Sequence, residues 1–122
     1  MKIKTSKCDD CRCLIARLKG ELDMATVEKF RKAVIPELEK NNFTFLLLNL
    51  SKVNFIDSTG LGAILGRYRV LDKKGGGILI VGMKPQVERI FSLSGMLKIM
   101  DQYQSEEEAI NYLQNKGEVN LA

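Results

Sequence analysis

The residues best suited to chemistry lie in one short stretch, Asp57-Ser58-Thr59-Gly60-Leu61-Gly62. An apolar run precedes this stretch and a helical spacing of apolar residues follows it, so it joins a strand to a helix. Asp57 or Ser58 can cap that helix, because a short side chain with an oxygen accepts a hydrogen bond from a free backbone N–H of the first turn. A role in helix capping would therefore be enough to explain both Asp57 and Ser58.

The two glycines of this stretch favour a functional interpretation. Gly60 and Gly62 keep side chains away from the Ser58 hydroxyl, so the backbone of another molecule can approach it closely. An enzyme would need Ser58 as a nucleophile, with Asp57 or Asp23 as its base. The chain has no histidine and no lysine beside Ser58, and an unactivated hydroxyl is a poor nucleophile, so we expect no enzymatic activity.

Three cysteines, Cys8, Cys11 and Cys13, form a second local cluster. A closed zinc site needs four Cys or His ligands, and the chain has no histidine and no fourth cysteine. We therefore expect no metal and no cofactor. The other interpretation is a β-hairpin that turns at Asp9-Asp10, with Cys8 opposite Cys11. In a reducing cytosol these residues would remain dispensable thiols.

Composition indicates one globular domain over residues 1–122, because 45% of the residues are apolar and 28% are charged. No apolar run reaches the roughly 20 residues that cross a bilayer, and the first residues lack the apolar block of a signal peptide. We expect a cytoplasmic protein that does not bind membranes. The net charge of +4 is modest and the basic residues are spread along the chain, which argues against direct nucleic-acid binding.

The first half of the chain predicts a hairpin followed by a helix. Residues 3–8 and 12–18 are strand candidates that together favour an antiparallel hairpin. Residues 24–38 then carry apolar side chains at helical spacing, after a turn that offers Asp23 as a second cap. Pro36 lies inside this helix and cannot donate a backbone hydrogen bond, so we expect a kink just before it.

The second half alternates strands and helices. Residues 43–50 and 77–81 are apolar on both alternating sets of positions, as in central strands covered on both faces. Such units favour parallel strands adjacent in chain order, with the intervening helices on one face. The final helix or the hairpin must then cover the second face. The expected helices start at Ser58, at Pro85 and after Ser105, and a short last strand is expected at 97–100.

Three motifs resemble a known family: Gly20-Glu21-Leu22-Asp23, the stretch 57–62, and Phe91-Ser92-Leu93-Ser94-Gly95-Met96. From about residue 10 to residue 113 the sequence is similar to an anti-sigma factor antagonist (anti-anti-sigma factor) of the STAS domain family. The similarity is closest to the sporulation antagonists of endospore-forming bacteria. It implies an α/β fold: a single STAS domain with a mostly parallel sheet of four to five strands, an N-terminal antiparallel hairpin and four helices.

The resemblance also implies a regulatory switch without catalytic activity. The unphosphorylated form would bind an anti-sigma factor that is also an ATP-dependent serine kinase, and so release the sigma factor. Phosphorylation of Ser58 would end this interaction, and a separate serine phosphatase would reverse the phosphorylation. A STAS scaffold or regulatory module without kinase exchange is the alternative. The residues that match the family's contact surface are Glu21, Asp23, Asp57, Ser58, Thr59, Gly60, Leu61 and Gly62.

Overall fold

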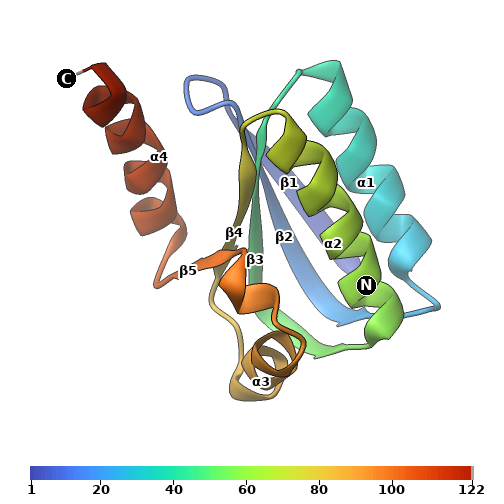
Figure 1. The fold of residues 1–122 in the computed structure, drawn as a ribbon. Coiled ribbons are helices and arrows are strands. Elements are labelled where there is room, and N and C mark those ends of the chain that lie inside the picture. Colours follow the sequence, from blue (N-terminus) through green and yellow to red (C-terminus); the bar gives the residue numbers. More distant parts are fainter. Residues whose placement is uncertain (122) are drawn as a thin grey trace.

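Five strands and four α-helices make up residues 1–121, the part of the chain that the computed structural model describes; side chains are described up to Lys116 (Figure 1). The strands are β1 (Lys2–Cys8), β2 (Cys13–Leu22), β3 (Phe45–Ile56), β4 (Gly77–Val81) and β5 (Asp101–Tyr103). The helices are α1 (Val27–Lys40), α2 (Ser58–Lys73), α3 (Pro85–Leu93) and α4 (Glu106–Leu121), with a 3₁₀ turn, η1 (Met96–Lys98). No helix among the described residues is long and apolar enough to cross a bilayer.

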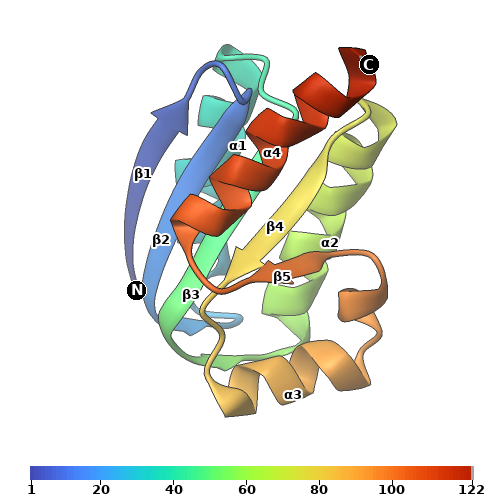
Figure 2. The same ribbon diagram turned by 90° about the vertical axis from the view of Figure 1, so that its left-hand side faces the viewer.

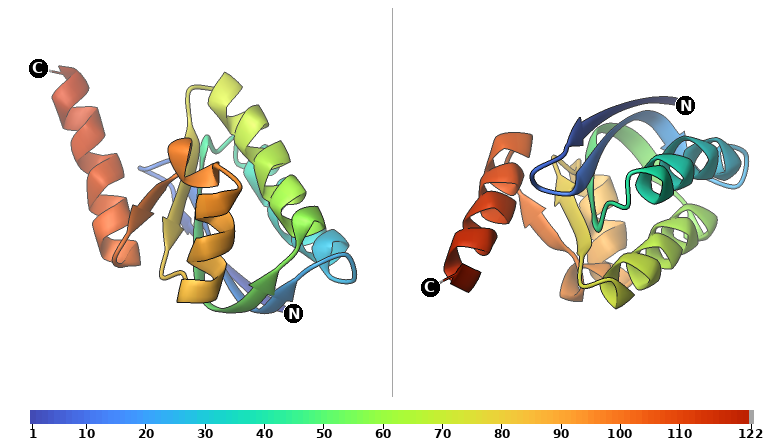
Figure 3. Two further views of the ribbon diagram at one scale, coloured as in Figure 1. Left: turned by 60° about the horizontal axis from the view of Figure 1, so that its bottom comes forward. Right: turned by 90° about the horizontal axis from the view of Figure 1, so that it is seen from above.

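The strands form one sheet in the order β1-β2-β3-β4-β5, as expected from the sequence. β1 pairs with β2 antiparallel, and every other neighbouring pair is parallel. α1 and α2 lie on one face of the sheet, while α4 crosses the other (Figures 2 and 3). α3 lies beyond the ends of β3 and β4, on the same side of the molecule as the start of α2 (Figure 1). The final helix thus covers part of the second face.

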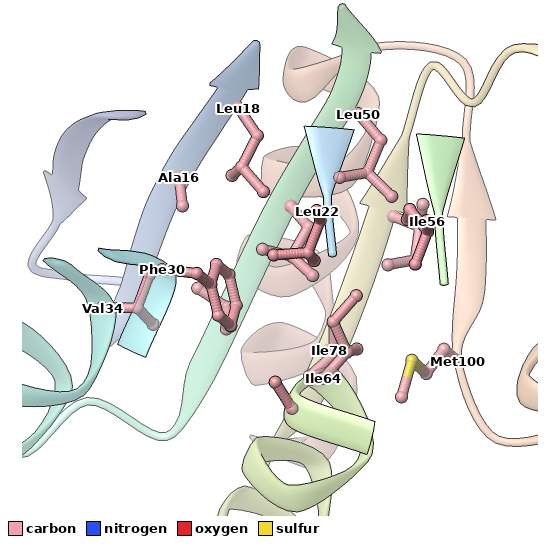
Figure 4. Close-up of a cluster of buried hydrophobic side chains, with 14 of the residues drawn as sticks. Ala16, Leu18, Leu22, Phe30, Val34, Leu50, Ile56, Ile64, Ile78 and Met100 are labelled. Atoms are coloured by element: carbon pink, nitrogen blue, oxygen red, sulfur yellow. The ribbon is translucent and has the colours of Figure 1, made fainter. Parts of the chain in front are cut away.

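Two apolar cores follow from the alternation of side chains along the strands. The larger core lies between the sheet and α1, α2 and α3, and it contains Phe91 as well as Phe30 and Ile64, which are labelled in Figure 4. The smaller core lies under α4, where Ala109 and Leu113 pack on the opposite face of the sheet. In β3, the fully buried neighbours Leu46, Leu47 and Leu48 supply both cores in turn. This explains why that strand is apolar on both alternating sets.

β2 is longer than the sequence predicted. A turn was expected at residues 19–23, but the strand continues to Leu22. The register between β2 and β3 is irregular at two places, between Arg17 and Lys19 and between Gly20 and Glu21. These irregularities accommodate the polar residues at the end of β2. Gly20 has a φ of +113°, a conformation that residues with a side chain rarely adopt. The loop before α1 therefore begins only at Asp23.

The start of α1 also differs from the expectation. Met24 was placed on the apolar face of this helix, but α1 begins at Val27 and Met24 is 78% exposed. The N-cap is Thr26, while Asp23 forms the turn that precedes it. The chain stays helical through Pro36, and the helix ends at Lys40.

Two short segments correct the sequence prediction further. Cys8 pairs with Cys13 rather than with Cys11, because residues 9–12 form a wider turn that is closed by a hydrogen bond from Arg12 N to Asp9 O. Residues 97–100 are not a strand. Met96 and Met100 are both buried and lie one helical turn apart, so this segment forms η1, and β5 follows it.

Candidate functional site

Asp57 caps α2, which decides between the two capping interpretations. Its backbone is extended, with φ −97° and ψ −177°, and its Oδ1 accepts a hydrogen bond from Gly60 N at 2.9 Å. Ser58 is the first residue of the helix and is exposed. Its hydroxyl makes no hydrogen bond with the described part of the chain, so the helix start does not need it.

The same carboxylate ties α2 to the loop between β2 and α1. Asp57 Oδ2 accepts a hydrogen bond from Met24 N at 3.1 Å, and the backbone N–H of Asp57 donates to Leu22 O at 3.2 Å. Two segments far apart in sequence therefore meet beside Ser58. Both Asp57 oxygens accept backbone hydrogen bonds, so this carboxylate is a structural connector.

Asp23 organises its own loop. Its Oδ1 accepts hydrogen bonds from Ala25 N at 2.9 Å and from Thr26 N at 3.2 Å. The Thr26 hydroxyl in turn accepts from Asp23 N at 3.0 Å and donates to Glu21 O at 2.8 Å. These bonds fix the loop that carries Met24 to the end of β2, where Glu21 lies.

The two glycines of the motif have different roles in the fold. A Cβ at Gly60 would lie 2.4 Å from Leu22 O and 2.9 Å from Leu22 Cγ, so only glycine lets α2 approach β2 this closely. Gly60 is also buried. At Gly62 a Cβ would meet no atom within 4 Å, and this residue is exposed. Only Gly62 leaves open surface near Ser58; any contact of Gly60 with a partner would have to use its backbone.

The remaining predicted residues divide between surface and packing. Glu21 is exposed, whereas Thr59 and Leu61 are half-buried, and Leu61 packs against the larger core. Gly62 lies one helical turn along α2 from Ser58, and Glu21 lies near the end of β2. The structure brings the predicted residues together on one end of the sheet, although Gly60 and part of Leu61 face inward.

Two exposed apolar residues near this site were missed from the sequence. Met24, whose backbone binds Asp57, and Phe55, which is 47% exposed and pairs in register with Glu21, both project from the segments that flank Ser58. Met24 was assigned to a helix by its spacing. Phe55 lies in a part of β3 that was not predicted as strand. Exposed large apolar side chains are typical of contact surfaces.

The start of α2 can accept an anion. The N–H groups of Ser58 and Thr59 find no acceptor among residues 1–116, since Asp57 takes the bonds from Gly60 and Leu61. Free N–H groups and the helix dipole favour negative charge at this position.

The cysteine cluster is part of the smaller core. Cys11 and Cys13 are buried, and burial raises the pKa of each thiol to about 12. Both residues are therefore thiols at neutral pH. Within residues 1–116, no three Asp, Glu, Cys or His side chains are grouped as metal ligands.

Comparison with known proteins agrees with this fold. A profile of the STAS domain matches residues 3–109, so the chain belongs to the STAS domain family. The anti-sigma F factor antagonist of Paenibacillus polymyxa is 38% identical over 101 residues, which are 83% of this chain and 86% of that protein. The chain therefore resembles an anti-sigma factor antagonist of the SpoIIAA type, a class of regulatory protein.

Two solved structures extend the similarity to the fold. The anti-sigma factor antagonist SpoIIAA in its unphosphorylated form matches with a TM-score of 0.74 and 26% identity, over 93% of this chain and 98% of that chain. The phosphorylated form of Bacillus SpoIIAA, described as a cell fate determinant, matches with a TM-score of 0.73 and 28% identity, over 92% and 99% of the two chains. The expected STAS fold is confirmed.

Proposed function

We propose that this chain is an anti-sigma factor antagonist controlled by phosphorylation of Ser58. In its unmodified form it binds an anti-sigma factor that is also an ATP-dependent serine kinase, and a sigma factor is released. Phosphorylation by that kinase ends the interaction, and a serine phosphatase restores the active form. The protein acts in the cytoplasm and, like the sporulation antagonists it resembles, serves a developmental sigma factor. The observation that carries the proposal is the exposed Ser58 hydroxyl, which the cap of α2 leaves unused.

The structure supports a phosphate on Ser58 without loss of the fold. A phosphoserine carries about −1.5 to −2 charges at pH 7. At the first helical residue it would lie beside the N–H groups of Ser58 and Thr59, where a helix favours an anion. The cap itself is made by Asp57, so the modification does not compete with it. We therefore expect the phosphorylated protein to keep its structure.

The effect of the phosphate falls on the partner. The exposed apolar side chains of Met24 and Phe55 belong to the two segments that adjoin the start of α2, and we expect a complex to cover them. A double negative charge placed there must lose its water and finds no positive side chain of this chain in the same loops. An unpaired charge buried in an interface costs about 3 kcal/mol, which corresponds to about a 100-fold loss of affinity.

The site geometry speaks against Ser58 as a catalytic nucleophile. The nearest carboxylate in the sequence, Asp57, uses both oxygens for backbone hydrogen bonds to Gly60 and Met24. Asp23 is engaged in its own turn. A serine becomes a nucleophile only when a neighbouring base takes its proton, and the chain contains no histidine for this role.

The test is a binding titration against the cognate anti-sigma factor with nucleotide present. It compares wild type, Ser58→Ala, Ser58→Asp and wild type phosphorylated by the kinase. Wild type and Ser58→Ala should bind tightly, and the phosphorylated protein about 100-fold more weakly. Ser58→Asp should lie between them, because one carboxylate carries less charge than a phosphate.

Thr59→Val is the matched control, since it removes the neighbouring hydroxyl and leaves Ser58 intact. Mass spectrometry should find one phosphate on wild type and on Thr59→Val, and none on Ser58→Ala. Equal affinity of the phosphorylated and unmodified proteins would refute the switch. If no form binds an anti-sigma factor, a STAS scaffold without kinase exchange becomes the better description.

A further inference from the structure

A cavity of ≈ 390 Å³ opens on the face of the sheet that α4 only partly covers. Figure 2 shows that α4 crosses this face diagonally and leaves the ends of β1, β2 and β3 near the N-terminus uncovered. We call this cavity the basic basin. It lies on the opposite face of the sheet from α2 and so is separate from Ser58. Its lining residues are Lys2, Lys4, Arg17, Leu18, Lys19, Asn49, Ser51, Lys52 and Glu106.

The basic basin gathers the positive charge of the chain. Its lining contains five basic side chains and one carboxylate, a formal +4 that equals the net charge of the whole sequence. The rest of the chain is therefore balanced. In the sequence these basic residues are dispersed over three strands, which is why composition alone gave no sign of an anion-binding surface. The fold concentrates them in one concave place.

The strand register sets like charges directly opposite one another. Lys2 pairs with Lys19 across β1 and β2, and Lys19 pairs with Lys52 across β2 and β3, which makes a row of three lysines. Lys4 lies opposite Arg17 in the same way. Like charges directly opposite on neighbouring strands destabilise a sheet. A bound anion would remove this repulsion.

The single carboxylate of the basin does not neutralise the lysines. Glu106 Oε2 and Oε1 accept hydrogen bonds from Arg17 Nε at 2.8 Å and Arg17 Nη2 at 2.7 Å, and Oε2 also accepts from Asn49 Nδ2 at 2.8 Å. Glu106 is thus fully used in holding Arg17 and the start of α4. Within residues 1–116, Lys2, Lys4, Lys19 and Lys52 form no salt bridge.

We propose that the basic basin binds a small polyanion that carries two or more phosphoryl groups. Its volume falls in the range of small-molecule sites, roughly 300–1,000 Å³. The row of three lysines spans about 10 Å across strands that are about 4.8 Å apart, which suits several linked charges better than a single ion. Lysine ammonium groups bind phosphate as point charges, and the Ser51 and Asn49 side chains add polar lining. A concave site fits a compact ligand and does not fit the flat surface of a bilayer.

The experiment uses the full chain and inorganic triphosphate as the probe, with binding measured by calorimetry at low salt. The basin variant is Lys19→Gln/Lys52→Gln. The matched control is Lys73→Gln/Lys74→Gln, which removes the same charge from exposed residues at the end of α2. Wild type should bind triphosphate with saturation, the basin variant about tenfold or more weakly, and the control within about twofold of wild type. Binding without saturation, or an equal loss in both variants, would show unspecific charge attraction and overturn the proposal.

Two further measurements distinguish ligand binding from a folding defect and from membrane binding. Without ligand, the basin variant should melt at the same or a higher temperature than wild type, because it loses like-charge repulsion. A lower melting temperature would mean that the lysines serve the fold, and would count against the proposal. Sedimentation with phosphatidylglycerol vesicles should bring down little protein. The proposal fails if the vesicles capture wild type but not the basin variant, and if this capture needs a lower concentration of lipid phosphate than the concentration of triphosphate phosphate needed for binding. The site would then be a membrane contact.

Discussion

The carboxylate of Asp57 accepts a hydrogen bond from the backbone N–H of Met24 at 3.1 Å, across 33 positions of sequence. Through this bond one side chain fixes both the start of α2 and the loop that leads into α1. The surface around Ser58 is therefore composite: its hydroxyl comes from the first residue of α2, and the exposed side chain of Met24 comes from the loop before α1. Changes at Asp57 and at Ser58 should have different consequences.

Asp57→Ala should destabilise the protein, because it removes the cap of α2 and the bond to Met24 together. Loss of a cap costs about 0.5–2 kcal/mol, and the loop bond adds to this. Ser58→Ala should change the free energy of unfolding by less than about 0.5 kcal/mol, since its hydroxyl has no partner in the fold. Urea unfolding followed by circular dichroism compares the two. A larger loss from Ser58→Ala than from Asp57→Ala would reverse the assignment of the cap.

Gly60→Ala should lower stability by about 2 kcal/mol or more, because the new methyl group would collide with Leu22. Gly62→Ala should be neutral or stabilising by up to about 1 kcal/mol, since alanine favours a helix and nothing lies nearby. The melting temperatures of the two variants measure the difference. Partner affinity gives the second comparison: Gly62→Ala should weaken binding in a folded protein if a partner's backbone approaches Ser58.

Met24→Gln should weaken binding to the anti-sigma factor by about tenfold while leaving the melting temperature unchanged, because the side chain is 78% exposed in the free protein. Val70→Gln is the control. Val70 is another exposed apolar residue, about 18 Å along α2 from Ser58. Calorimetric titration of both variants measures the effect. Equal affinities for the two would remove Met24 from the contact surface.

Glu106→Gln should reveal a pH-dependent contribution to stability. The hydrogen bond from Arg17 lowers the pKa of Glu106 against the opposing effect of burial, and Asn49 lowers it further. A carboxyl with a lowered pKa stabilises the fold above its unfolded pKa of about 4.3, and this contribution is lost as pH falls through the folded value. Wild type should therefore exceed the variant by at most about 1 kcal/mol near neutral pH, with the gap closing in acid.

Glu107→Gln serves as the control for this pH dependence, because Glu107 is exposed in the same helical turn. Urea unfolding at a series of pH values from neutral into acid provides the comparison. A gap between wild type and Glu106→Gln that stays constant with pH would mean that the Arg17 pair does not couple α4 to the sheet.

Apolar periodicity was enough to predict the strand order and the two-sided burial of β3. It failed where a backbone turn interrupts a regular spacing. Met24 fits the helical spacing of Val27 and Phe30, yet the hydrogen bonds that Asp23 accepts hold it outside the helix. Met96 and Met100 are likewise apolar, but their apolar character does not tell whether they lie in a strand or in a helix. In the structure, one helical turn places both side chains in the core.

The sequence named residues that the structure brings together at one end of the sheet, but it did not assign their roles in the fold. Both Asp57 and Ser58 have oxygens that can cap a helix, and only the extended backbone at Asp57 decides which one does. The internal role of Gly60 depends on its distance to Leu22, which the sequence does not contain. The basic basin could not be predicted from the sequence either, because it depends on the strand register that places Lys19 between Lys2 and Lys52.

The agreement between strand order and chain order has a consequence for synthesis on the ribosome. Each strand pairs with the strand made just before it, so the sheet can grow outward from the hairpin as the chain emerges. Among the described elements α4 is made last, and its Ala109 and Leu113 belong to the same core as Leu47 and Leu79. Until α4 has left the exit tunnel, the nascent sheet presents these side chains to water. That interval is when a chaperone, or a second nascent chain, has an apolar face to bind.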